Sequence, residues 1–195
     1  MMINRLYKKL CINKAKKIHK ECSKYIVGSV LDVGSGRGYI AKEISKSGIK
    51  VQCLDVKDLN LTDLPLKIYD GKKIPFRAKS FDTVLVCYVL HHVDNPISLL
   101  KECARVAKKR IIIFEDNADS LLTKPLDILF NRLHGVDTPL NFRNISQWIK
   151  EFKKLGLKII KIKRGVEKQW FYPGVEHIMF VVGKVEGKNG NERRL

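Results

Sequence analysis

Short apolar runs alternate along the chain with segments in which apolar side chains recur every three or four residues. Runs of strand length occupy residues 30–33, 51–54, 66–69, 81–87, 110–114, 157–162 and 178–182. Segments with helical spacing occupy residues 39–47, 96–107 and 146–155. Strands that alternate with helices usually form a mainly parallel sheet with helices on both faces. The pattern therefore predicts an α/β fold built on seven strands.

The first part of the chain has a helical pattern of its own. Apolar residues between positions 3 and 26 recur at helical spacing, and lysine and arginine side chains stand between them. This spacing predicts an amphipathic helix, or a broken pair of helices, with a basic outer face. A solvated face on a helix packed against the body is the simpler interpretation. An arm that binds RNA or a membrane surface is the alternative.

Two segments interrupt the alternation of strands and helices. Residues 117–144 are too long for a plain connection and contain an apolar cluster, so we expect a lid-like insertion with its own helix after Pro125. Residues 165–176 have the character of a loop, and they contain three consecutive aromatic residues, Trp170, Phe171 and Tyr172. These aromatic rings are expected either to stack on a flat ligand or to pack onto the end of the sheet.

The length and composition fit one globular domain. A chain of 195 residues is long enough to bury a core without disulfides, and no linker or internal repeat divides it. We expect a single domain at 1–185, whose residues 1–27 form the basic helical segment, followed by a flexible polar tail at 186–195.

Several features favour a reduced, cytoplasmic protein. No apolar run approaches the roughly 18 residues that a membrane-spanning helix needs, and the N-terminus lacks the apolar core of a secretory signal. The five cysteines form no Cys-x-x-Cys pair and show no zinc-like spacing. Since no cluster of metal-ligating residues is visible either, we expect no metal site.

The net charge of +18 is large for a chain of this size. Such a field attracts nucleic acid, anionic lipid and phosphorylated metabolites alike. However, 28 of the 38 basic residues are lysines, whereas specific phosphate recognition relies more on arginine. The charge is therefore compatible with RNA as a partner. A general compositional bias of the sequence explains the excess of lysine equally well.

The segment LDVGSGRGYI, residues 31–40, carries the strongest chemical signal. A predicted strand leads into Asp32, then into Gly34, Gly36 and Gly38, and then into a helix. Glycines let the backbone approach a ligand closely, and the helix presents free amides. A carboxylate two residues before the first glycine would repel a pyrophosphate but suits a nucleoside ligand that bears an ammonium group. The G-x-G-x-G spacing also differs from the G-x-G-x-x-G of dinucleotide sites.

Two further signals follow this glycine loop. Asp55 stands at the end of the second predicted strand, where a carboxylate can accept hydrogen bonds from both hydroxyls of a ribose. This signal alone fits nicotinamide or flavin nucleotides equally well. The other signal is the turn-like segment 70–76, which precedes the apolar strand at 81–87.

In this order the motifs resemble the class I S-adenosylmethionine-dependent methyltransferases, specifically the methyltransferase type 11 group. The resembling segments are LDVGSGRG, LDVKD, DGKKIPF, SFDTVLVCYVLHHVDNP and RIIIFED. The resemblance is strong over residues 28–116 and looser over NFRNISQWIKEFKKLGLKI and EHIMFVVGK. It implies a Rossmann-like, doubly wound fold, with a mostly parallel seven-stranded sheet, helices on both faces and an antiparallel last strand.

The resemblance implies that S-adenosylmethionine is the cofactor and that S-adenosylhomocysteine is the product. Asp32 would hold the methionine amino group, directly or through water. The glycine loop would let the backbone pass the amino-acid and ribose portions of the cofactor. Its implied binding residues are Gly34, Ser35, Gly36 and Gly38.

Further cofactor contacts are implied along the next two strands. Asp55 would bind the ribose hydroxyls, and Val56 would lie beside the adenine. Asp70 would accept a hydrogen bond from the exocyclic amine of the adenine, with Gly71 giving it room. Purely structural roles are the alternatives, since Asp70 could start a turn and Asp55 could cap a helix.

The residues after the fourth strand are the ones closest to the expected chemistry. Cys87 and Tyr88 would lie near the sulfonium. His91 and His92 are candidate catalytic residues, although a base is needed only if the acceptor must lose a proton. His92 could instead bond to nearby backbone. The segment 87–90 lacks the Asn/Asp-Pro-Pro-Tyr/Phe motif, which argues against methylation of adenine N6.

We expect the methyl acceptor to be a small molecule, because the resembling group mostly methylates metabolites, quinones and lipids and because the apolar insertion suits a lid. RNA, as a tRNA or rRNA substrate, is the alternative that the charge supports. A regulator that binds the cofactor without catalysis is less favoured, and the glycine spacing opposes a nicotinamide oxidoreductase. The acceptor pocket should lie at the carboxyl ends of the strands, between the N-terminal helix and the segments 117–144 and 165–176.

Overall fold

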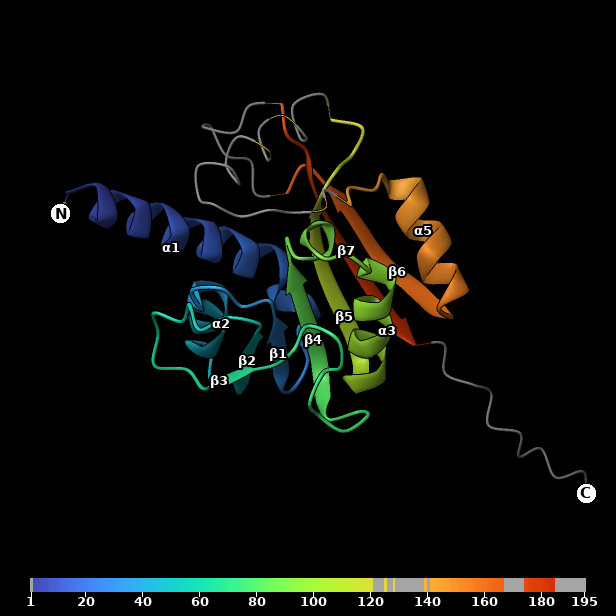
Figure 1. The fold of residues 1–195 in the computed structure, drawn as a ribbon, viewed down its shortest axis with the longest axis horizontal. Coiled ribbons are helices and arrows are strands. Elements are labelled where there is room, and N and C mark those ends of the chain that lie inside the picture. Colours follow the sequence, from blue (N-terminus) through green and yellow to red (C-terminus); the bar gives the residue numbers. More distant parts are fainter. Residues whose placement is uncertain are drawn as a thin grey trace, which may run out of the picture.

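A seven-stranded sheet forms the centre of the computed structural model, which describes residues 2–120, 125, 128, 139, 141–166 and 174–184. The strand order is β3-β2-β1-β4-β5-β7-β6 (Figure 1). The strands are β1 (Val30–Val33), β2 (Val51–Asp55), β3 (Leu66–Ile68), β4 (Phe81–Cys87), β5 (Ala107–Asp116), β6 (Leu157–Arg164) and β7 (His177–Lys184). Only β7 runs antiparallel to its neighbours β5 and β6, so the predicted fold class is confirmed.

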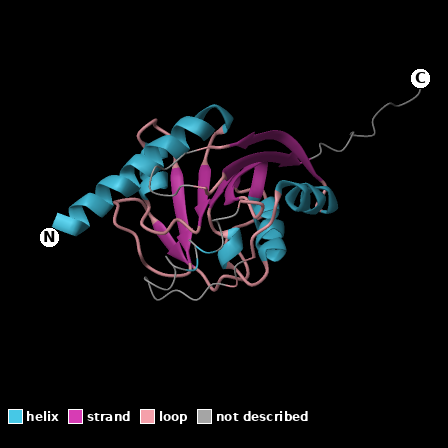
Figure 2. Ribbon diagram, turned by 90° about the horizontal axis from the view of Figure 1, so that it is seen from above, coloured by secondary structure: helices cyan, strands magenta, loops and turns pink. Residues whose placement is uncertain are grey.

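Helices cover both faces of this sheet, as Figure 2 shows from above. They are α1 (Met2–Cys22), α2 (Tyr39–Ser45), α3 (Pro96–Val106) and α5 (Ile145–Lys154), with short 3-10 turns η1 (Ser23–Tyr25) and η2 (Leu90–His92). The N-terminal segment is therefore one long helix followed by a 3-10 turn, and its N-terminal end extends beyond the body (Figure 1).

The core consists of two apolar layers, one on each face of the sheet. Ile18 of α1 and Ile44 of α2 are fully buried against one face. Leu100 of α3, with Trp148 and Phe152 of α5, is buried against the other. Since successive residues of a strand point to opposite faces, the continuous apolar runs predicted from the sequence supply both layers at once.

Local sequence explains where two of the helices begin. The Asn95 side chain accepts a hydrogen bond from the Ser98 amide (2.9 Å), and Pro96 occupies the first turn of α3 as expected. A reciprocal pair of hydrogen bonds between Asn144 and Gln147 forms a capping box at α5.

Four strands are longer than the apolar pattern predicts, and two of them, β2 and β6, end later than expected, at Asp55 and Arg164. β5 ends at Asp116 and not at Phe114, and β7 begins at His177 and not at Ile178. The reason is that the added residues, Glu115, Asp116 and His177, are polar and yet buried, so a search for apolar runs stops before them. These three residues extend the sheet at the edge where the carboxyl ends of the parallel strands lie.

Some expectations concern residues outside those described. They are the helix within the insertion after Pro125, the three aromatic residues Trp170, Phe171 and Tyr172, and the tail at 186–195. The division into one domain at 1–185 also stays a prediction. Among the described residues, no helix is both long and apolar enough to cross a bilayer.

Candidate functional site

The glycine loop lies between the end of β1 and the start of α2. Gly34, Gly36 and Gly38 all have positive φ, at 70°, 52° and 76°. The amides of Gly34 and Ser35 donate to the Leu54 carbonyl at 2.8 and 3.2 Å, which ties the loop to β2. A Cβ on Gly34 would lie 2.4 Å from Cγ2 of Val89, whereas one on Gly36 would meet nothing within 4 Å. The loop is thus closely packed at its first glycine and open at its second.

Asp32 lies under this loop, inside β1. It is only 2% exposed, and its Oδ2 atom has no hydrogen-bond partner among the described residues. Burial, and secondarily the charge of Asp55, raises the pKa of Asp32 to about 7. A buried carboxyl oxygen without a partner is costly, so this position is suited to a ligand that brings a hydrogen-bond donor or a positive charge.

Asp55 connects the glycine loop to the end of β2. Its Oδ2 accepts a hydrogen bond from the Gly36 amide at 2.7 Å, and its Oδ1 accepts one from the Val56 amide at 2.7 Å. The carboxylate therefore holds the turn of the loop in place. Because Asp55 is bonded to the Gly36 amide, a ligand bound to this carboxylate would lie beside the glycine loop.

Asp70 begins a turn at the adjacent edge of the sheet. Its Oδ1 accepts hydrogen bonds from the amides of Lys72 (2.9 Å) and Lys73 (3.2 Å), and these bonds lower the pKa of this exposed carboxylate. A Cβ on Gly71 would lie 3.3 Å from Val56, whose side chain is half exposed. The turn thus accounts for one oxygen of Asp70, and a role toward a nucleobase stays a proposal.

Tyr88 follows Cys87 at the carboxyl end of β4, and its φ of 56° is unusual for a residue other than glycine. Its amide donates to the Phe114 carbonyl at 2.8 Å. Its ring lies edge-on to His177, with centroids 5.3 Å apart, and the Lys14 ammonium lies 3.9 Å from the ring centre. The strained backbone therefore directs this ring toward β7 and α1.

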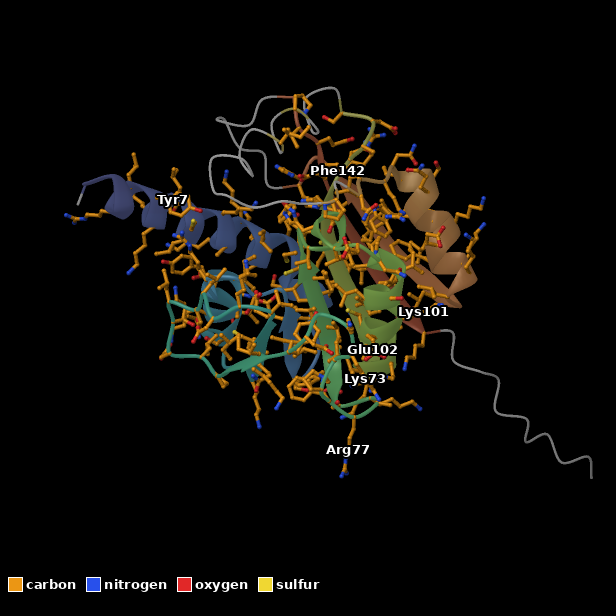
Figure 3. All side chains as sticks on the ribbon, viewed as in Figure 1. Tyr7, Lys73, Arg77, Lys101, Glu102 and Phe142 are labelled. Carbon is orange, nitrogen blue, oxygen red and sulfur yellow. The ribbon has the colours of Figure 1, made fainter. Side chains whose placement is uncertain are left out.

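His91 is buried at the same edge of the sheet, on the face that α3 covers. Its Nδ1 lies 2.5 Å from Oε2 of Glu115, while Oε1 of Glu115 accepts hydrogen bonds from the amides of Val89 (3.1 Å) and Leu90 (2.7 Å). The ring of Phe142, labelled in Figure 3, stacks on His91 at 4.7 Å. These contacts hold the segment after β4, which favours a positioning role for His91.

His92 lies next to it in a different environment. The two imidazole centroids are 4.0 Å apart, and the Nδ1 atom of His92 is buried without a hydrogen-bond partner in the described part of the chain. Burial, and then the neighbouring His91, lowers the pKa of His92 to about 4. His92 is therefore neutral at physiological pH and a weak base.

We expect Glu115→Ala to destabilise the fold by about 3 kcal/mol or more, because three buried donors would lose their acceptor at ~1–3 kcal/mol each. Chemical denaturation measures this loss. Glu151→Ala is the matched control, since Glu151 only pairs with Lys154 on the surface of α5 and is expected to contribute less than ~1 kcal/mol. Similar losses in both variants would contradict the role given to Glu115.

The raised pKa of Asp32 predicts a pH effect on stability. The folded state keeps a proton on Asp32 between about pH 4 and about pH 7, where the unfolded chain has lost it. The free energy of unfolding of the wild type should therefore fall, relative to that of Asp32→Asn, as the pH rises through this window. Denaturation of both proteins at about pH 5 and about pH 8 tests this, and a constant difference would contradict it.

The sequence did not single out His177 and Asp116, which form a second pair at this edge. His177 Nδ1 lies 2.6 Å from Asp116 Oδ1, and both side chains are buried. The two residues are register partners on β5 and β7. The available signal was the end of RIIIFED and the histidine before the last apolar run, but their pairing depends on the antiparallel register.

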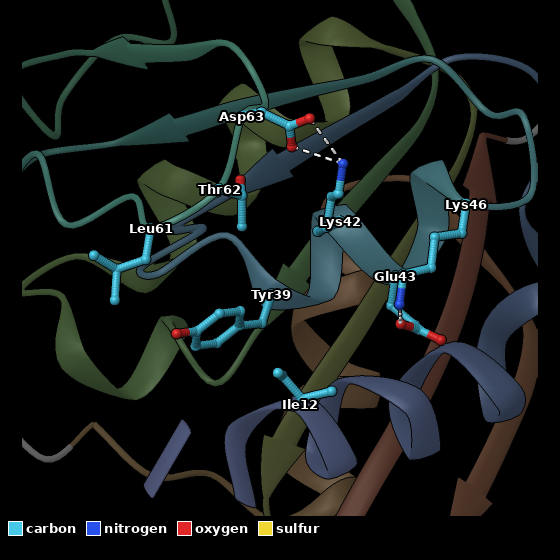
Figure 4. Close-up of a pocket in the computed structure, with 8 residues that line it drawn as sticks. All are labelled: Ile12, Tyr39, Lys42, Glu43, Lys46, Leu61, Thr62 and Asp63. Carbon is cyan, nitrogen blue, oxygen red and sulfur yellow. Dashed lines mark hydrogen bonds and ion pairs between the residues drawn. The ribbon is translucent and has the colours of Figure 1, made fainter. Parts of the chain in front are cut away.

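A cavity of about 370 Å³ lies elsewhere, between α1, α2 and the loop before β3 (Figure 4). Its lining includes two ion pairs, Lys42 with Asp63 and Lys46 with Glu43. Figure 4 shows both pairs at its rim. None of Asp32, Asp55 or Asp70 lines it, so we do not equate it with the site at the sheet edge.

The comparisons with known proteins agree with this geometry. Residues 31–114 match the family model described as "Methyltransferase domain". The chain has a TM-score of 0.66 to a solved S-adenosylmethionine-dependent methyltransferase of Methanosarcina mazei, with 15% identity over 85% of this chain and 97% of that one. Residues 31–114 thus resemble a methyltransferase domain, and the strand order and fold of the chain are those of the class I S-adenosylmethionine-dependent methyltransferases.

Two relatives are similar in sequence. An uncharacterized protein of Methanocaldococcus jannaschii is 29% identical over 166 residues, which cover 84% of this chain and 76% of the relative. The ubiquinone biosynthesis O-methyltransferase of Nitrosospira multiformis is 32% identical over 91 residues. That match covers 40% of this chain and 38% of the relative, so it says little about the acceptor.

No group of three or more His, Cys, Asp or Glu side chains able to hold a metal occurs in the described ranges.

Proposed function

We propose that the protein transfers a methyl group from S-adenosylmethionine to a small-molecule acceptor at the carboxyl edge of the sheet. The observation that carries the proposal is the buried Oδ2 atom of Asp32, which lies below the glycine loop without a hydrogen-bond partner among the described residues. An α-ammonium group satisfies such an atom, whereas a pyrophosphate would be repelled. When bound, S-adenosylmethionine supplies an electrophilic methyl group on its sulfonium.

The remaining cofactor contacts are assigned to residues around Asp32. Gly34, Ser35, Gly36 and Gly38 would follow the amino-acid and ribose portions with their backbone. This assignment is supported by the open space above Gly36, where a Cβ would meet no atom within 4 Å. The buried hydroxyl of Ser35, which has no hydrogen-bond partner in the described ranges, is a further group that a ligand can satisfy.

Asp55 and the edge of β3 would hold the nucleoside. Asp55 is assigned to the ribose hydroxyls, since its carboxylate lies at the carboxyl end of β2 beside the loop. Val56 is half exposed and offers an apolar surface to the adenine. Asp70 has an oxygen beyond the one used in its turn, and it is assigned to the exocyclic amine of the adenine, with Gly71 beside it.

Methyl transfer itself requires that the acceptor approach the sulfonium in line, in a site that excludes water. Cys87 and Tyr88 are assigned to the neighbourhood of the sulfonium, because they leave β4 beside the glycine loop. His91 and His92 remain candidates for contact with the acceptor. The burial of His91 and its contacts with Glu115 favour a role of this residue in positioning the segment after β4.

A small acceptor is supported by the character of this edge. Aromatic and polar side chains are packed closely there, and Tyr88 stands between α1 and β7. RNA is the second candidate, supported by the charge of +18, and exposed lysines such as Lys16, Lys108 and Lys161 lie on several different elements.

The cofactor assignment is tested by isothermal titration calorimetry with S-adenosylmethionine, S-adenosylhomocysteine and NAD⁺. We expect binding of the first two and none of NAD⁺, because the glycine loop lies above a carboxylate. Binding of NAD⁺ alone would contradict the assignment. A protein that binds S-adenosylmethionine but transfers no methyl group to any fraction of a cell extract would instead be a regulator.

A further inference from the structure

We propose that His177, oriented by Asp116, is the general base that removes the proton from a phenol or catechol hydroxyl as that oxygen is methylated. This inference rests on the proposed function, since it requires methyl transfer at the same edge of the sheet. It gives the acceptor a chemical class, an acidic O–H group, and it assigns the base to β7 and not to the histidines that follow β4.

The geometry of the pair is that of an oriented imidazole. His177 Nδ1 lies 2.6 Å from Asp116 Oδ1. The Nδ1–H group can therefore donate a hydrogen bond to the carboxylate, which leaves Nε2 with a basic lone pair. Nε2 is buried and has no hydrogen-bond partner among the described residues. The free position of the imidazole is thus the one from which it can accept a proton.

The alternation of side chains along the strands explains why this pair faces the chemistry. Phe114 and Asp116 of β5, like Met179 and His177 of β7, point to the face that α1 covers. Glu115 lies between them in sequence and points to the other face, where it holds His91. The two histidine and carboxylate pairs therefore have separate tasks, His91 on one face and His177 on the other.

His177 is in contact with the residue expected to lie at the reacting methyl group. The ring of Tyr88 lies edge-on to it at 5.3 Å, at an interplanar angle of 77°. His177 also belongs to the lining of a cavity of about 440 Å³, together with Arg164, Val166 and Glu176. A displacement of the Tyr88 side chain would connect Nε2 with an acceptor beside the sulfonium.

The charges around the pair favour an acceptor that becomes an anion. Lys14 of α1 lies 3.9 Å from the centre of the Tyr88 ring and contributes to lowering the pKa of Asp116. A positive charge in this place stabilises a phenolate relative to the neutral phenol. A phenol, with a pKa near 10, is also within reach of an imidazole base, whereas an aliphatic alcohol is far less acidic.

The proposed step is balanced. A lone pair of the acceptor oxygen forms the new bond to the methyl carbon, and the carbon–sulfur bond breaks with its electron pair going to sulfur. The hydroxyl proton moves to Nε2 of His177, and it leaves to solvent once the product departs. No metal or oxidant takes part.

Nuclear magnetic resonance of the wild-type protein, labelled with ¹⁵N in its histidines and saturated with S-adenosylhomocysteine, tests the base directly. In spectra recorded near pH 8 we expect an Nδ1 proton and no Nε2 proton on the imidazole of His177, because Nδ1 faces Asp116, and we expect catechol to shift the Nε2 resonance. Several titratable or charged groups surround the His177 imidazole and influence where its proton lies. They are Asp116 of β5, Tyr88, Lys14 of α1, His91 and His92 of η2, and Glu176 and Arg164 beside the cavity. A proton on Nε2 at this pH would overturn the proposal.

Transfer assays test the catalytic role and separate it from the proposed function. Phenol, catechol and 3,4-dihydroxybenzoate are the probes, with butylamine and 2-mercaptoethanol for comparison. We expect methylation of the hydroxyl probes by the wild type, with a kcat that rises with pH as general-base catalysis requires. His177→Gln should lower kcat by about 100-fold or more and abolish this rise, with the Kd for S-adenosylmethionine unchanged. Asp116→Asn should also lower kcat, without a comparable change in KM.

His19→Gln is the matched control, because His19 lies in the last turn of α1 and no contact with the cofactor or the acceptor is assigned to it, so kcat should be unchanged. Equal kcat values for His177→Gln and His19→Gln would overturn the base. A wild type that binds S-adenosylmethionine but methylates only the amine or the thiol, or none of the probes, would overturn the acceptor class. A wild type that does not bind S-adenosylmethionine would overturn the proposed function itself.

Discussion

Gly34→Ala is expected to lower the free energy of unfolding by about 2–5 kcal/mol and to abolish measurable cofactor binding. An alanine at φ 70° carries a backbone cost of about 1–2 kcal/mol. Its Cβ would also lie 2.4 Å from Val89, and such overpacking adds about 1–3 kcal/mol. Since Val89 begins the segment held by Glu115, the overlap would displace either that segment or the glycine loop. Chemical denaturation and calorimetry measure the two effects.

Gly48→Ala is the matched control for this variant. Gly48 has a similar φ of 78°, but a Cβ there would meet nothing within 4 Å. The control should therefore lose only the backbone cost, about 1–2 kcal/mol, and should bind S-adenosylmethionine as the wild type does. Equal losses in the two variants would show that close packing at Gly34 does not matter.

Asp55→Ala is expected to weaken S-adenosylmethionine binding by about 100-fold or more, with a smaller loss of stability. Hydrogen bonds to a charged acceptor contribute ~1.5–3 kcal/mol each, and the variant would lose those to the ribose hydroxyls. It would also release the amides of Gly36 and Val56, which now donate to the carboxylate at 2.7 Å. The glycine loop would lose its anchor at the same time.

Two further variants separate these contributions. Asp55→Asn keeps one acceptor oxygen for the Gly36 amide, so it should retain most of the stability while still binding the cofactor weakly. Asp63→Ala removes a carboxylate that pairs only with the exposed Lys42, and it should leave cofactor affinity unchanged. An affinity of Asp55→Ala within threefold of the Asp63→Ala value would exclude Asp55 as the ribose ligand.

The fold was largely predictable because its central strands, β1, β4 and β5, contain runs that are apolar on both faces. Runs such as 81–87 and 110–114 are continuous in hydrophobicity, and helices with clear spacing separate them. In contrast, the pattern ended β5 too early and began β7 too late. Glu115, Asp116 and His177 are buried polar residues, and their burial depends on partners distant in sequence.

The same limit applies to the candidate site. The glycine loop is local in sequence, so its spacing alone pointed to Asp32 and to a nucleoside ligand. The pair of His177 and Asp116 joins residues 61 positions apart, through an antiparallel register that no local motif encodes. His91 drew attention because it follows a recognisable motif, although its contacts with Glu115 favour a positioning role.

The most direct test of the account is methyl transfer from S-adenosylmethionine carrying a tritiated methyl group, in an extract of the source cells that is then separated into RNA, protein and small molecules. Asp55→Ala protein serves as the control and should transfer little label. We expect the label in the solvent-extractable, small-molecule fraction, resistant to nuclease. Label in a nuclease-sensitive fraction would contradict the account and would make the basic surface part of an RNA-binding site.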